Sequence, residues 1–254
     1  MPRVYHLDLD KRAIQGAKIA LLPGDPGRVG AIADAIAVTY GSSSLELASK
    51  REFVTFISEF NNNKVLVTST GIGGPSASIA VDELAQLGVK TFIRVGTTGA
   101  IQDYIKKGDC VITTGSVRFD GASTHYAPVE YPAVADHAVT GALIEGAKKT
   151  GVRYHVGVSA SSDTFYPGEE RKDSYREYTL RRFRGLTEEL KALHVLNFEM
   201  ESATVLTLTA SMGLKGGAVT GVVNRGSTGK ITDQALKLGE ESAIRVAVAA
   251  LAFL

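Results

Sequence analysis

Three arginines stand beside glycine-rich turns, a placement that suits the binding of an anion. Arg28 ends a Pro-Gly-Asp-Pro-Gly-Arg turn, Arg94 precedes Gly96 by two residues in an otherwise apolar run, and Arg51 lies in a charged segment. A guanidinium in an apolar run is costly to bury unless an anion or a carboxylate meets it. Its planar fork also matches a tetrahedral oxyanion better than lysine does. The pattern predicts an oxyanion site or, as the alternative for Arg94, a buried ion pair with an acid such as Glu201.

Three glycine-rich segments, residues 23–28, 70–76 and 94–99, stand where strand-like runs end. In open α/β sheets, ligands bind beyond the carboxyl ends of strands, where glycine lets backbone N–H groups approach an anion. Each segment could instead be only a tight turn. The second nearly matches a dinucleotide-binding fingerprint. However, Ser76 replaces the last glycine and the segment follows a hairpin, so a Rossmann cofactor site is not expected.

Short β-branched runs alternate with helical patterns, which is typical of a largely parallel sheet with helices on its faces. No repeat, flexible linker or shift in composition divides the chain, so we expect one domain over residues 1–254. An Asn61–Asn63 turn is expected to join two strands as a hairpin, and a helix is expected to end at Gly88. The expected strands are 19–22, 53–60, 65–70, 91–95, 110–114, 155–159 and 217–223, and helices are expected near 28–36, 139–149, 201–212 and the C-terminus.

Composition and charge narrow the possible functions. The chain has 254 residues, of which 44% are hydrophobic and 22% charged, with a net charge of +1. This excludes a disordered chain and disfavours binding to the nucleic-acid backbone. The single cysteine, Cys110, can form no intrachain disulfide and is expected in the core. No apolar run is long enough to span a membrane and no secretory leader is visible, so we expect a cytoplasmic protein without a membrane partner.

Six short motifs follow one another along the chain. They are Gly24-Asp25-Pro26-x-Arg28, Arg51-Glu52-Phe53, the segment from Ser69 to Ser76, Arg94-x-Gly96-Thr97-Thr98-Gly99, the segment from Ser161 to Gly168, and Glu199-Met200-Glu201-Ser202-Ala203. In this order they resemble those of the uridine phosphorylases, a branch of the hexameric nucleoside phosphorylase family. The resemblance runs from about Tyr5 to the C-terminus. It implies a single-domain three-layer α/β/α sandwich around a central twisted mixed β-sheet.

The resemblance also implies a reaction, its co-substrate and an assembly. Inorganic phosphate would displace the base from C1′ of uridine in a reversible pentosyl transfer, giving uracil and ribose 1-phosphate for pyrimidine salvage. Such a substitution passes through an oxocarbenium-like sugar, so positioning and charge stabilisation carry the catalysis. No organic cofactor is expected. The implied assembly is a homohexamer, a trimer of dimers with active sites shared across the dimer interface.

Residue by residue, the resemblance assigns the phosphate and ribose sites. Arg28, Arg94, Thr97 and Glu201 would carry the catalysis. The set implied for phosphate is the Gly24 backbone, Arg28, Arg94, Thr97 and, from a neighbouring subunit, Arg51; the set implied for ribose is His6, donated across the interface, Thr97, Met200 and Glu201. On the residues alone, Glu201 could instead complement the positive end of the helix that follows it.

The resemblance places the base against Phe165, Glu169, Arg171, Val222 and Val223. Phe165 offers a face for stacking, or else is a core aromatic. The family motif reads Pro-Gly-Gln-x-Arg, whereas this chain has Glu169 at the glutamine position. An ionised glutamate only accepts hydrogen bonds, whereas glutamine also donates. Three outcomes stay open: weaker uridine binding, a Glu169 that is protonated or paired with Arg171, or a shift towards another base.

The resemblance also implies a site for a monovalent cation. Glu52, the Ile72 carbonyl and Ser76 match a family site for a monovalent cation, expected to be potassium, or else are a surface carboxylate and a helix cap.

The residues allow two functions besides a phosphorylase of uridine or of another base. These are a nucleosidase of the same fold and a non-catalytic nucleoside-binding protein. A nucleosidase has no use for three arginines around an anion.

Overall fold

The computed structural model describes residues 3–226 and 229–254, and its centre is one mixed β-sheet. The order of the strands is β10-β6-β8-β9-β5-β1-β4-β3-β2, with β7 paired to β6. The strands are β1 (Ile19–Leu22), β2 (Leu45–Lys50), β3 (Phe53–Phe60), β4 (Asn63–Thr68), β5 (Thr91–Ala100), β6 (Cys110–Phe119), β7 (Ala133–Val134), β8 (Tyr154–Ser162), β9 (Asn197–Glu199) and β10 (Lys215–Arg225).

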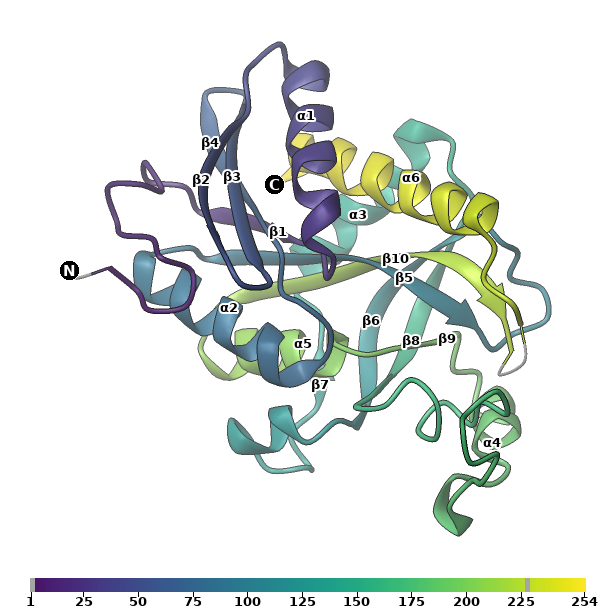
Figure 1. The fold of residues 1–254 in the computed structure, drawn as a ribbon. Coiled ribbons are helices and arrows are strands. Elements are labelled where there is room, and N and C mark those ends of the chain that lie inside the picture. Colours follow the sequence, from purple (N-terminus) through teal and green to yellow (C-terminus); the bar gives the residue numbers. More distant parts are fainter. Residues whose placement is uncertain (1–2, 227–228) are drawn as a thin grey trace.

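Helices cover both faces of this sheet, as expected for a three-layer α/β/α sandwich (Figure 1). On one face, α1, α3 and α6 bury an apolar stripe against the strands, and on the other α2 and α5 do so. The helices are α1 (Val29–Tyr40), α2 (Gly74–Leu87), α3 (His137–Thr150), α4 (Leu186–Ala192), α5 (Ser202–Ser211) and α6 (Asp233–Ala250). None of them, within the described residues, is long and apolar enough to cross a membrane.

Several local predictions are confirmed at the level of single residues. The β3–β4 hairpin turns on Asn61 and Asn62, whose φ angles of 45° and 63° are left-handed. Helix α2 ends at Gly88, which has a φ of 111°. Cys110 is fully buried in the core, and this burial raises the pKa of its thiol to about 12.

The sheet closes on itself at one end, a feature that the strand pattern does not predict. β10 pairs with β5 in parallel and with β6 in antiparallel fashion, and β6, β8 and β9 lead back to β5. Strand β9 has only three residues, and no periodicity in the sequence marks it. The closure brings Glu199 at the end of β9 next to the central strand β5.

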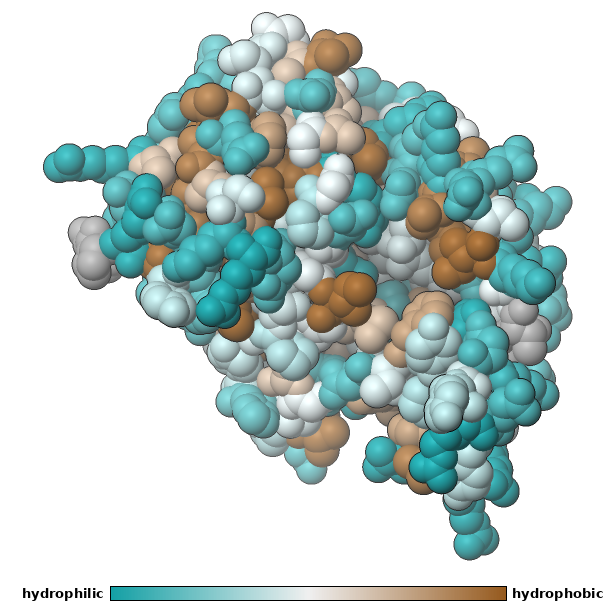
Figure 2. All heavy atoms as spheres, viewed as in Figure 1, coloured by the Kyte–Doolittle hydropathy of each residue, from teal (hydrophilic) through white to brown (hydrophobic). Residues whose placement is uncertain are grey.

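The opposite edge of the sheet carries uncovered apolar side chains. On the face drawn in Figure 2, hydrophobic residues gather over the ribbon formed by β2, β3 and β4, while most of the remaining face is hydrophilic. Among the large apolar side chains, Leu45 of β2 is 59% exposed, and Tyr5 and Ile72 are also exposed. Apolar surface next to an edge strand is typical of an interaction site.

Candidate active site

A large cavity of about 630 Å³ opens where the carboxyl ends of parallel strands meet. Its volume lies within the usual range for small-molecule sites. Strands β1, β4, β5 and β10 run in the same direction and end at this opening, as the rule for open α/β sheets predicts. The lining includes Gly24, Arg28, Glu52, Ile72, Arg94, Thr97, Phe165, Glu169, Met200, Glu201, Val223, Leu236 and Glu240.

Arg94 lines the cavity and is held by two carboxylates. Its Nε donates to Glu199 Oε2 at 2.9 Å, and its Nη2 contacts Glu201 Oε2 as an ion pair that lacks hydrogen-bond alignment. Burial alone would lower the pKa of Arg94, but the two carboxylates raise it, so the guanidinium stays charged. The ion pair expected as the alternative is therefore present, in a residue that also lines the cavity.

Gly96 makes room for this guanidinium. A Cβ at position 96 would lie 2.8 Å from Nη2 and 2.9 Å from Cζ of Arg94. Because both carboxylates pin the guanidinium, it could move aside only by loosening those ion pairs. The glycine therefore serves close packing, in addition to any role in a turn.

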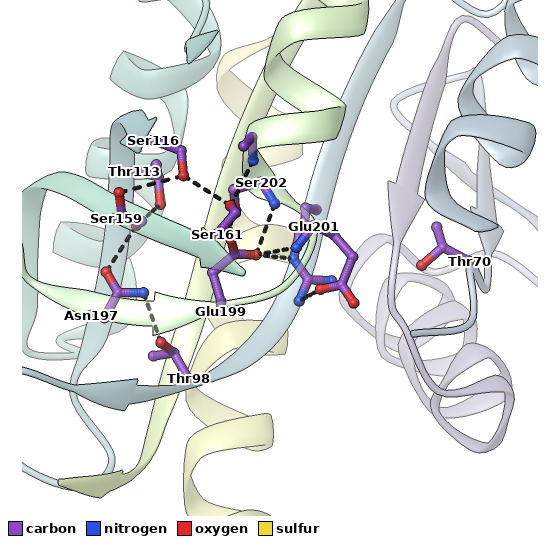
Figure 3. Close-up of polar contacts among 12 residues, drawn as sticks. Thr70, Thr98, Thr113, Ser116, Ser159, Ser161, Asn197, Glu199, Glu201 and Ser202 are labelled. Atoms are coloured by element: carbon purple, nitrogen blue, oxygen red, sulfur yellow. Dashed lines mark hydrogen bonds and ion pairs between the residues drawn. The ribbon is translucent and has the colours of Figure 1, made fainter. Parts of the chain in front are cut away.

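Glu199 is the carboxylate of the site with the most hydrogen bonds among the described contacts, and no separate role was expected for it. Its Oε2 accepts from the backbone N–H groups of Glu201 and Ser202 at 2.9 and 2.8 Å, besides Arg94. Its Oε1 accepts from Ser161, whose hydroxyl also meets Ser116 and accepts from Ala203 N–H (Figure 3). Glu199 thus caps α5, so the helix-end role considered for Glu201 belongs to Glu199 instead.

Glu201 faces the cavity between the α2 and α5 helix ends. Its Oε1 accepts from the N–H of Gly73, the residue that precedes α2, at 2.6 Å. Burial raises the pKa of Glu201, and the neighbouring Glu199 adds to this, while Arg94 and the Gly73 N–H oppose it. Glu201 is thus a buried acceptor with lone pairs directed at the cavity region, suited to hydroxyl donors.

The turn after β1 forms part of the wall of the cavity, where phosphate is expected to bind. Gly24, Arg28 and Thr97 all line it. A Cβ at Gly24 would come within 3.3 Å of the Gly71 carbonyl, so the two loops approach closely. Arg28 Nε lies 3.5 Å from Glu240 Oε1 and 3.9 Å from Asp25 Oδ2.

Five of the expected site residues are not among those that line the cavity of their own chain: His6, Arg51, Ser76, Arg171 and Val222. Arg51 is exposed at the turn between β2 and β3, with a left-handed φ of 56°. His6 binds Glu83 of α2 through Nδ1 at 2.7 Å, and its backbone N–H donates to the same carboxylate. The expected contribution of His6 and Arg51 from a neighbouring subunit stays a prediction.

Apolar side chains that are expected near the base also line the cavity. Phe165 and Val223 line it, and Phe165 is only half-buried, so it is no core aromatic. The pairing of β10 with β5 shifts register between Val222 and Asn224, a bulge that re-aims the strand at Val223. Val222 instead packs in the apolar cluster with Val111, which corrects its expected place against the base.

Arg171 and Glu169 do not pair with each other among the described contacts. Arg171 is buried, stacks on the Phe165 ring at 4.4 Å and binds Asp173 through two nitrogens at 3.0 and 2.8 Å. Glu169 is buried at the cavity wall. Burial, reinforced by the carboxylate of Glu199, raises the pKa of Glu169 to about 8 against the opposing charge of Arg171. Of the three outcomes left open above, this favours a protonated Glu169.

Acidic groups outnumber basic ones around the cavity. Its lining includes two arginines, Arg28 and Arg94, and six acids, Asp25, Glu52, Glu169, Glu199, Glu201 and Glu240. Even with Glu169 neutral, each arginine already faces at least one carboxylate. A dianion entering this cavity would need more positive charge than one chain places there.

The potassium expectation rests on three neighbouring groups. A Cβ at Gly71 would lie 3.0 Å from Glu52 Cγ and 3.2 Å from Ser76 Oγ, so these side chains meet at Gly71. Ser76 donates to the carbonyls of Ile72 and Gly73 at 3.2 Å, and thereby closes the first turn of α2. Within residues 3–226 and 229–254, no three His, Cys, Asp or Glu side chains cluster as a metal site would require.

Comparison with known proteins identifies the family. The Phosphorylase superfamily model matches residues 18–254. The chain is 54% identical over 248 residues to "Uridine phosphorylase" of Salmonella typhimurium (97% of this chain, 96% of the relative) and 53% identical to that of Escherichia coli K12 over the same shares. It is 45% identical over 238 residues to "Uridine phosphorylase" of Thermococcus kodakarensis (94% and 82%). This chain, with its cavity at the strand ends of a mixed α/β sheet, therefore belongs to the phosphorylase superfamily.

Proposed function

We propose that the protein catalyses the reversible phosphorolysis of uridine to uracil and ribose 1-phosphate. The observation that carries this is the arrangement around Arg94, a buried arginine paired with two carboxylates in the lining of one cavity. The same cavity is lined by Arg28, which would bind the anion, and by Phe165, which would stack on the base. The names of the relatives support uridine as the nucleoside.

Arg28 and Arg94 would hold phosphate with Thr97 and the Gly24 backbone. In the proposed step a phosphate oxygen forms a bond to C1′ as the C1′–N1 bond breaks and its electrons leave with the base. The sugar passes through a cationic, oxocarbenium-like state, which the phosphate dianion and the nearby carboxylates stabilise. Arg94 keeps Nη1 available for phosphate, because its recorded carboxylate contacts use Nε and Nη2.

Glu201 would accept hydrogen bonds from ribose hydroxyls, with Met200 packed against the sugar. Both Glu201 oxygens have polar partners, Gly73 N–H and Arg94, which fix the orientation of the carboxylate. Each oxygen retains a further lone pair for a hydroxyl. A carboxylate held in this way needs little reorganisation as positive charge develops at C1′.

Glu169 would recognise uracil as a neutral acid. A protonated carboxyl group has one O–H donor and one C=O acceptor, the same pair of functions that a glutamine amide offers. With a pKa of about 8, Glu169 is mainly protonated at pH 7. The substitution of glutamate for glutamine is then compatible with uridine binding, with Arg171 as a second donor and Phe165 as the stacking face.

A second copy of the chain would complete the site, and we propose the homohexamer of the family as the assembly. The cavity of one chain has more acidic than basic groups, so Arg51 from a neighbour would supply the missing positive charge. The exposed apolar residues Tyr5, Leu45 and Ile72 belong to segments close in sequence to His6, Arg51 and the cavity loop. A potassium ion held by Glu52, Ile72 and Ser76 would need further oxygens from that neighbour.

The test is base release from uridine, thymidine, cytidine, inosine and guanosine, with and without inorganic phosphate. We expect uridine to be cleaved fastest and only when phosphate is present, with ribose 1-phosphate as the sugar product. Cleavage without phosphate would indicate a nucleosidase. Binding of uridine and phosphate without release of base over hours would indicate a binding protein.

A further inference from the structure

Glu240 places a carboxylate in the cavity wall beside Arg28, far in sequence from the turn that carries that arginine. Both residues line the cavity, and Glu240 Oε1 lies 3.5 Å from Arg28 Nε. The buried Nε has no hydrogen-bond partner among the described atoms. Asp25, the other acid near it, is 3.9 Å away and uses its Oδ1 to accept from Gly27 N–H. Glu240 is therefore the nearer partner of the guanidinium, and the contact is electrostatic.

The fold brings Glu240 to this position by a close helix–strand contact. The preceding residue, Gly239, lies against Gly221 of β10, where a Cβ at 221 would come within 1.8 Å of the Gly239 carbonyl. Farther along α6, Ala243 and Val246 are buried in the core. With this helix locked onto the sheet, the backbone at Glu240 has little freedom to retreat from the cavity.

The charges around the pair make it sensitive to an incoming anion. Burial lowers the pKa of Arg28 and Glu240 opposes this, while Arg94 lowers it further and Asp25 and Glu201 raise it. A phosphate bound by Arg28 would compete with Glu240 for the same guanidinium and would face its carboxylate at short range. Like charges at short range in a partly buried site repel strongly.

We propose that Glu240 is a positioning residue for Arg28, one that holds the guanidinium in the cavity wall before phosphate binds and lowers its affinity for phosphate through its charge. The proposal rests on the proposed function, since it assigns phosphate to Arg28. It predicts opposite effects for two substitutions. Glu240→Gln retains a carbonyl oxygen for Arg28 and removes the charge, whereas Glu240→Ala removes both.

The experiment measures KM for phosphate, KM for uridine and kcat in the full chain for both variants. We expect Glu240→Gln to lower KM for phosphate about three- to tenfold and Glu240→Ala to raise it by a similar factor, with KM for uridine changed less than about twofold. Glu241→Gln is the matched control, because Glu241 is exposed one residue along α6 and pairs only loosely with Lys237 at 3.9 Å. It should change none of these constants.

A binding measurement separates this proposal from the proposed function. The shift in thermal unfolding temperature caused by inorganic phosphate alone reports phosphate affinity without turnover. Under the proposal this shift is larger for Glu240→Gln and smaller for Glu240→Ala than for the wild type, even if the reaction proves to be another. Shifts in the same direction for both variants, or none in either, would overturn the role of Glu240.

Discussion

Uridine binding should weaken above pH 8 in a manner that depends on Glu169. The pKa of this carboxyl group is raised to about 8 by burial and by Glu199. A group with this pKa is about nine-tenths protonated at pH 7 and about one-tenth at pH 9. If only the protonated form pairs with the base, KM for uridine rises about tenfold between these pH values, because apparent affinity scales with the competent fraction.

The assay compares the wild type with Glu169→Gln from pH 6 to pH 9.5 at saturating phosphate. Uridine itself loses its N3 proton in alkaline solution, and this affects both proteins alike. The informative quantity is therefore the uridine KM of the wild type divided by the uridine KM of Glu169→Gln. We expect a ratio near one at pH 7 that rises about tenfold by pH 9. A ratio that stays constant over this range would refute the role given to the neutral acid.

The same pKa predicts a stability effect that needs no substrate. The folded-state pKa of Glu169 is raised from 4.5, so the folded chain keeps a proton that the unfolded chain loses as pH rises. Below about pH 4.5 Glu169 is protonated in both the folded and the unfolded chain, so its ionisation does not change the free energy of unfolding. Between that value and about pH 8 the loss of stability grows by roughly 1.4 kcal/mol per pH unit, to an upper bound of about 3 kcal/mol at pH 7. In urea unfolding, the free energy of unfolding of Glu169→Gln should therefore increase relative to that of the wild type as the pH rises across this window. The same difference between the two proteins at pH 5 and at pH 7 would contradict the raised pKa.

Three further substitutions test the centre of the site. Arg94→Met leaves two buried carboxylates without their cation, so the free energy of unfolding should fall by about 3–5 kcal/mol in denaturant titration, together with loss of phosphorolysis. Gly96→Ala pushes a Cβ to within 2.8 Å of the Arg94 guanidinium and should lower kcat/KM about 10- to 100-fold in a steady-state assay, whereas unchanged kinetics would show that Arg94 has room to move. Ser161→Ala removes a buried donor to Glu199 and an acceptor for a backbone N–H. The free energy of unfolding should therefore fall by about 1–3 kcal/mol, although the substitution changes no residue that lines the cavity.

Local sequence signals predicted most of the elements correctly, because each depends on few residues. The asparagine turn, the glycine that ends α2 and the β-branched strands carry their conformational preference within a short window. Some strands are longer than expected: β5 continues to Ala100 and β6 to Phe119. These extensions pair with β9, β8 and β10, partners that only the folded sheet supplies.

The parts of the site that the sequence did not reveal depend on tertiary contacts. A bulge in β10 decides that Val223 and not Val222 lines the cavity, and Glu240 reaches the cavity because two glycines let α6 approach that strand. Neither feature has a signal within its own segment. Glu199 stands beside the expected Glu201, but its role as the acceptor for Arg94 and the cap of α5 follows from the position of the short strand β9.

Arg94 illustrates why two alternatives drawn from the sequence need not exclude each other. The sequence allowed an oxyanion site or a buried ion pair, and the geometry provides the ion pair within the lining of the cavity. A guanidinium this deeply buried must have an anionic partner even when no ligand is bound, because an unpaired charge would cost several kcal/mol. Its nitrogens are numerous enough to keep that partner and still donate to a ligand. A resting ion pair is therefore a physical requirement of an arginine that waits in a buried site for an anion.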